Sequence, residues 1–477
     1  MKAQRWVWLG LAATTLLHLF LAARLPVADD EAYYRLWASH LAWGYPDHPP
    51  LIAALLAGSI RLFGDGPFGL RGLTMLLMSS LPLLLYLGGR DLFDRATGWR
   101  AAGILMVLPY VAVTVGAYPD VPLLVFWALG LWTGWHALHR GGWWWIAAAA
   151  AVGLALLSKL TAVFLLAGLA MTWITGPWRR SLRDPFWYAG LALGAGMLLP
   201  VVQWNTMHNW EMLRTAVYGP PLPVVRSLGE NLLVVLGGQF LYFGPIALLL
   251  IWAVVTAAGR WRAPAWRLLA STSVPLSLSL VFAAFNGIGK PHWPVPAYLA
   301  AVIGAAALWP EWRRLKSGLA GLAGATLFLI AAAVILFLAP GGLDLREYMG
   351  RWDRVADAAS REAERRNAFI LTSSYESASQ IAYHLRQRVP VTSPAGAFPL
   401  WHRSEETAGR KMVYVEDRLN RPGRSFLSLC AAPRSIGSIE IGPAYRTATL
   451  LRREEVKGVA VLYACERFLG FPTERAF

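Results

Sequence analysis

Long apolar segments recur along most of the chain and constrain its fold more than any other feature. Runs of roughly 17–25 apolar residues follow one another, and each is long enough to cross a hydrocarbon core about 30 Å thick. Of the 477 residues, 56% are hydrophobic and only 15% are charged. Soluble globular proteins do not carry so many such runs. The sequence therefore predicts an all-α polytopic membrane domain.

We expect about eleven transmembrane helices. The first apolar run, residues 6–23, resembles a signal peptide in length. It lacks a small-residue cleavage site and further spans follow, so we interpret it as a retained transmembrane helix. The run at 161–177 abuts its neighbour with almost no loop. The expected spans are 6–23, 72–89, 101–117, 121–138, 143–160, 161–177, 186–204, 231–256, 268–286, 294–310 and 318–339.

Loop charge predicts how these helices are oriented. Lys and Arg collect in alternate loops, whereas the loops between them balance basic with acidic residues. Because positively charged loops stay in the cytoplasm, we expect a cytoplasmic amino terminus in a multi-pass inner (plasma) membrane protein. An odd number of spans then leaves the C-terminal segment in the periplasm. The net charge of +16 follows from this topology and does not indicate nucleic-acid binding.

The chain changes character at Pro340-Gly341-Gly342, where charge rises and apolar runs end. We expect a transmembrane domain over 1–340 and a small periplasmic α/β domain over 341–477. Within the latter, the patterns predict strands at 367–374, 411–417 and 459–465 and a helix at 375–388. Cys430 and Cys465 both lie there, and a disulfide or two buried free thiols remain open.

The first outer loop, residues 24–71, is unusually rich in acidic residues. It holds Asp29-Asp30-Glu31 and then Asp47-His48-Pro49-Pro50. The following apolar stretch, Pro50–Gly64, is short and contains Arg61, which favours a helix lying along the membrane interface. A carboxylate at the membrane surface is costly unless it is solvated, paired or bound to a metal. A solvated connecting loop is the alternative to a functional site.

Three more outer segments carry polar groups. Asp120 lies between Pro119 and Pro122, a position typical of a helix cap. "WNTMHNWE" contains His208, and "NGIGKPHWPVP" contains Lys290 and His292. Single histidines usually fill hydrogen-bonded positions, but four outer loops that each present an acid, an imidazole or an ammonium at one membrane face favour a site.

The order "DDEAYY … DHPPL … YPD … LSK … WNTMHNW … KPHWPVPAY" resembles the bacterial GT-C fold glycosyltransferases of family 39/83. That family includes the aminoarabinose transferase of lipid A and relatives of the protein O-mannosyltransferases. The resemblance covers residues 1 to about 340. It implies a polyprenyl-phosphate sugar as donor and a periplasmic reaction.

Glycosyl transfer passes through an oxocarbenium-like transition state, and the leaving lipid phosphate needs cationic stabilisation. The acceptor hydroxyl needs a carboxylate base. The resemblance makes Asp30 the candidate base, and its neighbour Glu31 either holds the local structure or orients Asp30. Asp29 is an alternative base, and Asp120 is a further candidate catalytic carboxylate.

Two arrangements for the donor phosphate remain open. The resemblance makes Asp47 a metal ligand and His48 a phosphate contact, where histidine replaces the family's lysine. With His208, Asp47 would bind Zn²⁺ or Mn²⁺. In the metal-free arrangement, His48, Lys290 and Arg71 hold the phosphate. Lys159 at the outer end of its span either reaches the phosphate or extends to the interface.

Together these features predict an inverting glycosyltransferase, specific for a hexosyl or pentosyl group, that uses a polyprenyl (undecaprenyl) phosphate sugar. The acceptor would be lipid A, another glycolipid or a polysaccharide of the cell envelope. A polytopic lipid-linked sugar transporter or flippase is the alternative, although its charged residues are expected near mid-membrane and its halves as repeats.

The topology predicts that the carboxyl terminus is periplasmic. A reporter that is active only outside the cytoplasm, fused after Phe477, should be active. Activity of a cytoplasmic reporter at the same position would contradict the predicted orientation.

Overall fold

The computed structural model describes residues 2–218, 227–285, 292–310, 351–386, 388–401, 407–417, 426–443 and 457–469. The chain forms two compact units. The first comprises Met1–Ala23 and Trp43–Ile335, and the second comprises Arg24–Ala42 and Leu336–Phe477. The first part of the outer loop therefore folds with the C-terminal residues. The boundary expected at residue 340 lies outside the described residues.

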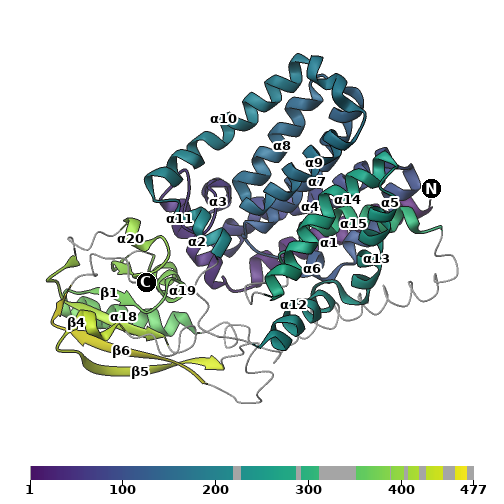
Figure 1. Ribbon diagram of the computed structural model, residues 1–477. Helices are drawn as coiled ribbons and strands as arrows, with labels where there is room; N and C mark the ends of the chain where they lie inside the picture. Colours follow the sequence, from purple (N-terminus) through teal and green to yellow (C-terminus); the bar gives the residue numbers. More distant parts are fainter. Residues whose placement is uncertain are drawn as a thin grey trace. The chain divides into compact units, whose positions relative to one another are not determined.

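The first unit is a bundle of apolar helices (Figure 1). Among the described residues, five helices are long and apolar enough to cross a membrane, and five shorter apolar helices have 10–17 residues. The expected span 318–339 lies outside the described residues, so the number of spans stays a prediction. The five long helices are α1 (Lys2–Arg24), α4 (Pro67–Leu92), α7 (Asp120–Arg140), α10 (Pro185–Met207) and α14 (Pro264–Phe285).

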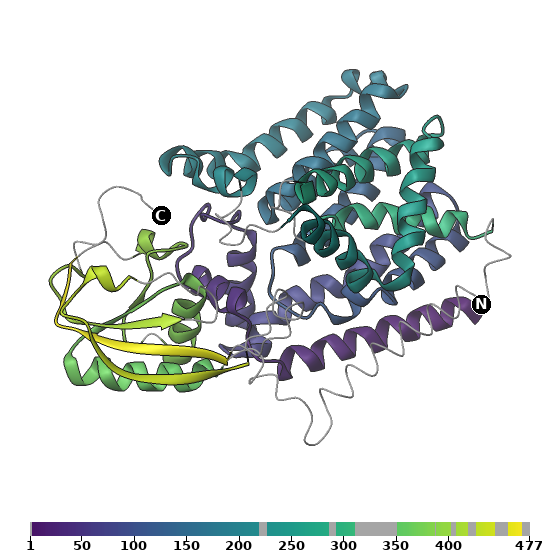
Figure 2. The same cartoon turned by 60° about the horizontal axis from the view of Figure 1, so that its bottom comes forward.

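Shorter helices make up the rest of the described part of this unit. One of them, α3 (Leu51–Phe63), coincides with the helix predicted over Pro50–Gly64, although its place at the membrane interface stays a prediction. Figure 2 shows α1 as a long, straight helix of the first unit. The remaining helices are α5 (Arg95–Met106), α6 (Pro109–Val113), α8 (Trp144–Ser158), α9 (Val163–Thr175), α11 (Glu211–Tyr218), α12 (Leu228–Phe243), α13 (Ala247–Gly259) and α15 (Val295–Leu308).

Two expected spans are interrupted. The run at 101–117 divides into α5 and α6, because Pro109 has no N–H to donate and opens a new helix at its first turn. The run at 231–256 divides into α12 and α13. There, Gly244 caps α12 with φ +61° and Pro245 follows it. Hydrophobicity alone does not show these breaks.

The second unit contains a five-stranded sheet in the order β2-β1-β3-β6-β5. β1 pairs in parallel with β2 and β3, whereas β6 is antiparallel to both β3 and β5. The predicted strands and helix are present. The elements are α18 (Trp352–Arg366), β1 (Phe369–Thr372), α19 (Tyr375–Leu385), β2 (Val391–Thr392), α20 (Phe398–Trp401), β3 (Met412–Asp417), β4 (Cys430–Ala431), β5 (Arg434–Pro443), β6 (Lys457–Cys465) and β7 (Arg467–Phe468).

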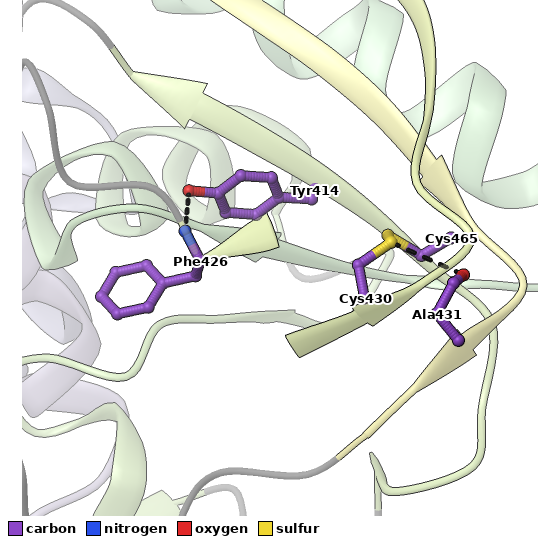
Figure 3. Close-up of a disulfide and its surroundings, with 5 residues drawn as sticks. All are labelled: Tyr414, Phe426, Cys430, Ala431 and Cys465. Atoms are coloured by element: carbon purple, nitrogen blue, oxygen red, sulfur yellow. Dashed lines mark hydrogen bonds between the residues drawn. A yellow bond between two sulfur atoms is a disulfide. The ribbon is translucent and has the colours of Figure 1, made fainter. Parts of the chain in front are cut away.

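A disulfide joins Cys430 in β4 to Cys465 at the end of β6 (Figure 3). It settles the alternative that the sequence left open. The cystine belongs to a buried core that includes Phe369, Tyr414 and Phe468. The hydroxyl of Tyr414 accepts a hydrogen bond of 3.0 Å from the backbone N–H of Phe426, which fixes the segment that leads to β4.

Removing this cross-link should destabilise the second unit. The two cysteines are 35 residues apart, and closing a loop of that length stabilises a fold by about 3–4 kcal/mol through the unfolded chain. The Cys430→Ser/Cys465→Ser variant should therefore melt at a lower temperature than the parent. An unchanged melting temperature, or two titratable thiols in the unreduced parent, would contradict this assignment.

Candidate functional site

An ion pair between Asp120 and Lys159 lies at one end of the helical bundle. Asp120 is the first residue of α7 and Lys159 directly follows α8. These helices are joined by a short turn, so the start of one lies beside the end of the other. Lys159 Nζ donates hydrogen bonds to Asp120 Oδ1 and Oδ2 at 2.9 and 3.0 Å. The side chains are only 12% and 17% exposed, so the pair is well shielded.

Four other polar side chains surround this pair. The imidazoles of His48 and His292 lie within electrostatic range of the Asp120 carboxylate. So do the phenol groups of Tyr110 and Tyr242. The Tyr110 and Tyr242 rings are 5.6 Å apart, and Tyr242 lies 6.3 Å from the His292 ring. We call these six residues the ion-pair cluster.

The cluster joins segments that are far apart in the sequence. His48 comes from the turn before α3, where the Tyr45 N–H donates to the His48 carbonyl at 3.2 Å. Asp120 and Lys159 come from "YPD" and "LSK", and His292 from "KPHW". The structure thus brings together four of the segments on which the family resemblance rested. An ammonium has three N–H donors, and its bonds to Asp120 use two.

Arg71 has a different environment. It is 1% exposed within α4, and its Nη1 donates a hydrogen bond of 3.1 Å to the carbonyl of Ala22 in the last turn of α1. This bond satisfies a carbonyl that lacks an intrahelical partner. The contact joins α4 to α1. The role in phosphate binding predicted for Arg71 stays a prediction. Lys290, the other predicted phosphate contact, lies outside the described residues.

In the described part of the chain, no three His, Cys, Asp or Glu side chains gather around a common point where a metal ion could bind. His208 caps the end of α10. Its Nδ1 lies 2.7 Å from the Trp204 carbonyl and its ring stacks on Trp204 with centroids 4.1 Å apart. Asp47 lies half-buried in the turn before α3. A Zn²⁺ or Mn²⁺ site at these two residues stays a prediction.

The acidic motif Asp29-Asp30-Glu31 forms the first turn of α2 (Asp29–Ser39), in the second unit. Acidic residues are favourable there because the N-terminus of a helix carries a partial positive charge. Glu31 is 1% exposed, and its Oε2 accepts a 3.0 Å hydrogen bond from the Ala28 N–H, so it caps the helix. Asp30 is exposed.

Asp29 is held by the C-terminal residues. Gln380 Nε2 in α19 donates to Asp29 Oδ1 at 2.9 Å and to the Val27 carbonyl at 3.0 Å. Burial, opposed by the Gln380 hydrogen bond and assisted by the charges of Glu376, Asp30 and Asp417, raises the pKa of Asp29 to about 7. Asp29 therefore changes charge near neutral pH, unlike an ordinary exposed aspartate.

Sequence reasoning missed three of these residues and one pairing. It did not pair Lys159 with Asp120, although both were placed at outer ends of neighbouring spans, which was the available signal. Tyr110 and Tyr242 gave no signal, because tyrosines at helix ends usually serve as interfacial anchors. Gln380 is 351 positions from Asp29, and no sequence pattern connects them.

The described helices of the first unit thus form an apolar bundle with polar groups gathered at one end. Residues 47–204 match the family model described as dolichyl-phosphate-mannose-protein mannosyltransferase. That match covers the segment with His48, Asp120 and Lys159. No protein with a curated description matches the chain by sequence.

Solved structures share the fold. ArnT from Cupriavidus metallidurans, in the apo state, is 16% identical with a TM-score of 0.64, over 97% of this chain and 98% of that one. The same protein bound to undecaprenyl phosphate gives a TM-score of 0.62 at 16% identity, over 96% and 98% of the chains. The oligosaccharyltransferase AglB from Archaeoglobus fulgidus, with an inhibitory peptide and dolichol-phosphate, gives 0.52 at 14% identity, over 86% and 69%. These likenesses confirm the GT-C fold expected from the motifs.

Breaking the ion pair should destabilise the bundle. Removing one partner of a buried pair leaves an uncompensated charge and costs roughly 3–5 kcal/mol. Lys159→Met should therefore lower the melting temperature in detergent, and Lys159→Met/Asp120→Asn should recover most of the loss. If the single and double variants melt like the parent, the pair does not stabilise the bundle.

Proposed function

We propose that the chain is an inverting glycosyltransferase that moves a sugar from a polyprenyl-phosphate donor to a cell-envelope acceptor. The observation that carries this proposal is the ion-pair cluster, in which four motif segments supply an acid, an ammonium and two imidazoles at one end of an apolar bundle. A lipid-linked phosphate sugar needs both an apolar environment for its chain and cations for its phosphate.

The cluster suits the departure of a phosphate leaving group. When the sugar–phosphate bond breaks, negative charge develops on the lipid phosphate, and fixed cationic donors lower the energy of that transition state. Lys159, His48 and His292 would supply them. In the metal-free arrangement Lys290 and Arg71 would also hold the phosphate, and in the metal-dependent one Asp47 and His208 would hold a metal ion beside it. Asp120 holds the Lys159 ammonium in place, so the ammonium does not have to be reoriented during the reaction.

The acceptor hydroxyl would lose its proton to Asp30 as the sugar is transferred. Attack by the hydroxyl on the anomeric carbon forms the new glycosidic bond, the bond to phosphate breaks, and the electron pair leaves with the phosphate. Configuration inverts because there is one displacement. Asp30 is exposed on α2, as a base that must meet an acceptor has to be.

The similar structures support this choice of donor. ArnT was solved with undecaprenyl phosphate and AglB with dolichol-phosphate, so both bind a polyprenyl phosphate. The fit of this chain to their fold makes a donor of the same class the natural candidate. We propose an inner-membrane location, a periplasmic reaction, and a glycolipid such as lipid A or a polysaccharide as acceptor.

Replacing the proposed base should abolish most of the transfer. Asp30→Asn keeps the size of the side chain but cannot accept the proton, and loss of a general base typically lowers the rate by about 10²–10⁴. Transfer from a radiolabelled polyprenyl-phosphate sugar to an envelope lipid extract measures this. Melting temperature should stay near that of the parent, because an exposed aspartate supports no core.

Asp29→Asn is the matched control, since its side-chain oxygen can still accept the Gln380 hydrogen bond. It should retain most of the activity. A parent-like rate in Asp30→Asn, combined with a large loss in Asp29→Asn or Asp120→Asn, would show that another carboxylate is the base.

A further inference from the structure

Helix α2 is held by elements that follow it by more than 300 residues. It lies beside α19 (Figure 1), and its residues Glu31–Trp37 are all buried. Yet α2 is a polar helix, with acidic residues in its first turn and an arginine in its middle. A short helix of this composition does not persist without tertiary contacts. The C-terminal residues must therefore supply its stability.

The first contact is at the entrance to α2. Gln380 is 2% exposed, and its amide N–H₂ group uses both donors there, one on the Val27 carbonyl and one on Asp29 Oδ1. Val27 precedes the helix and Asp29 begins it. The two bonds therefore fix both the direction of the chain and the first turn, in which Asp30 is the next residue.

The second contact is one turn further along. The hydroxyl of Tyr33 accepts a 2.7 Å hydrogen bond from the Ala397 N–H. Its ring lies 4.6 Å from that of Tyr375 at the start of α19 and is stacked with Phe398, 6.4 Å away. A Cβ atom at Gly396 would lie 2.7 Å from the Tyr33 hydroxyl oxygen, and Gly396 has φ +67°, so this close approach requires glycine.

We propose that the C-terminal domain positions the candidate base, and that Gln380 is the positioning residue that fixes the first turn of α2. This inference rests on the proposed function, because it assigns Asp30 to the reaction. It gives the C-terminal domain a part in catalysis. A displacement of a reacting group by about 1 Å can lower a reaction rate by about 100-fold. The contacts that fix the first turn of α2 are therefore expected to affect the rate of transfer.

Kinetics of four variants test the proposal in the full-length protein. Gln380→Ala removes the hydrogen-bond donor of this contact and Asp29→Ala removes its hydrogen-bond acceptor, whereas Asp29→Asn keeps a side-chain oxygen that can accept the bond. His384→Ala, on the same helix but exposed and interacting with Asp353 and Asp357 of α18, is the control for α19. We expect kcat to fall about 10-fold or more in Gln380→Ala and Asp29→Ala, with the KM for the donor changed less than about 3-fold. Asp29→Asn and His384→Ala should stay near the parent.

Hydrogen exchange provides a readout that does not need activity. In Gln380→Ala, amides of residues 28–37 should exchange faster, while those of β1 and β3 stay protected. Unchanged protection of α2, or parent-like kcat in both Gln380→Ala and Asp29→Ala, would overturn the proposal. If Gln380→Ala also loses protection in β1 and β3, this variant unfolds too widely to be informative. The kcat values of Asp29→Ala and Asp29→Asn then test the proposal: a lower kcat in Asp29→Ala alone supports it, and equal values overturn it. A parent protein without glycosyl-transfer activity would refute the proposed function. The rate of amide hydrogen exchange in α2 would then still show whether Gln380 holds this turn.

Discussion

A charged group in an apolar bundle needs a partner, and the ion pair between Asp120 and Lys159 is where this chain meets that need. A carboxylate and an ammonium that are each less than one-fifth exposed stabilise each other only when their geometry is good, and both oxygens of Asp120 bond to Lys159. The pair also sets a local charge pattern, because His48 and His292 are within range of the same carboxylate. In the function proposed above, the ammonium, the imidazoles and the phenols act together on an anionic ligand.

The sequence was most informative where one physical rule dominates. Hydrocarbon thickness predicted the long helices such as α4 and α10, and the short segments 367–374, 411–417 and 459–465 were correctly predicted as the strands β1, β3 and β6. It was least informative where a single proline or glycine interrupts an apolar run, as at Pro109 and Gly244, because hydropathy averages over such residues. The disulfide stayed open until the structure brought β4 and β6 together.

For the candidate site, the sequence identified residue types and the side of the membrane on which they were expected to lie, but not their partners. The family resemblance implied His48, and Asp120 was chosen as an acidic residue in a short outer turn; both belong to the ion-pair cluster. Arg71 was chosen for its charge, but it bonds to the end of α1, which composition does not reveal. The contact of Gln380 with Asp29 spans almost the whole chain, so only tertiary structure shows it.

The proposed function requires that the protein breaks a sugar–phosphate bond in a polyprenyl-phosphate donor. The most direct test reconstitutes the purified protein in liposomes with a labelled polyprenyl-phosphate sugar and an envelope lipid extract, and measures free polyprenyl phosphate. We predict that it is released in step with labelling of the acceptor, and only when acceptor is present. Movement of the intact donor between leaflets without any release would contradict the account and identify a transporter.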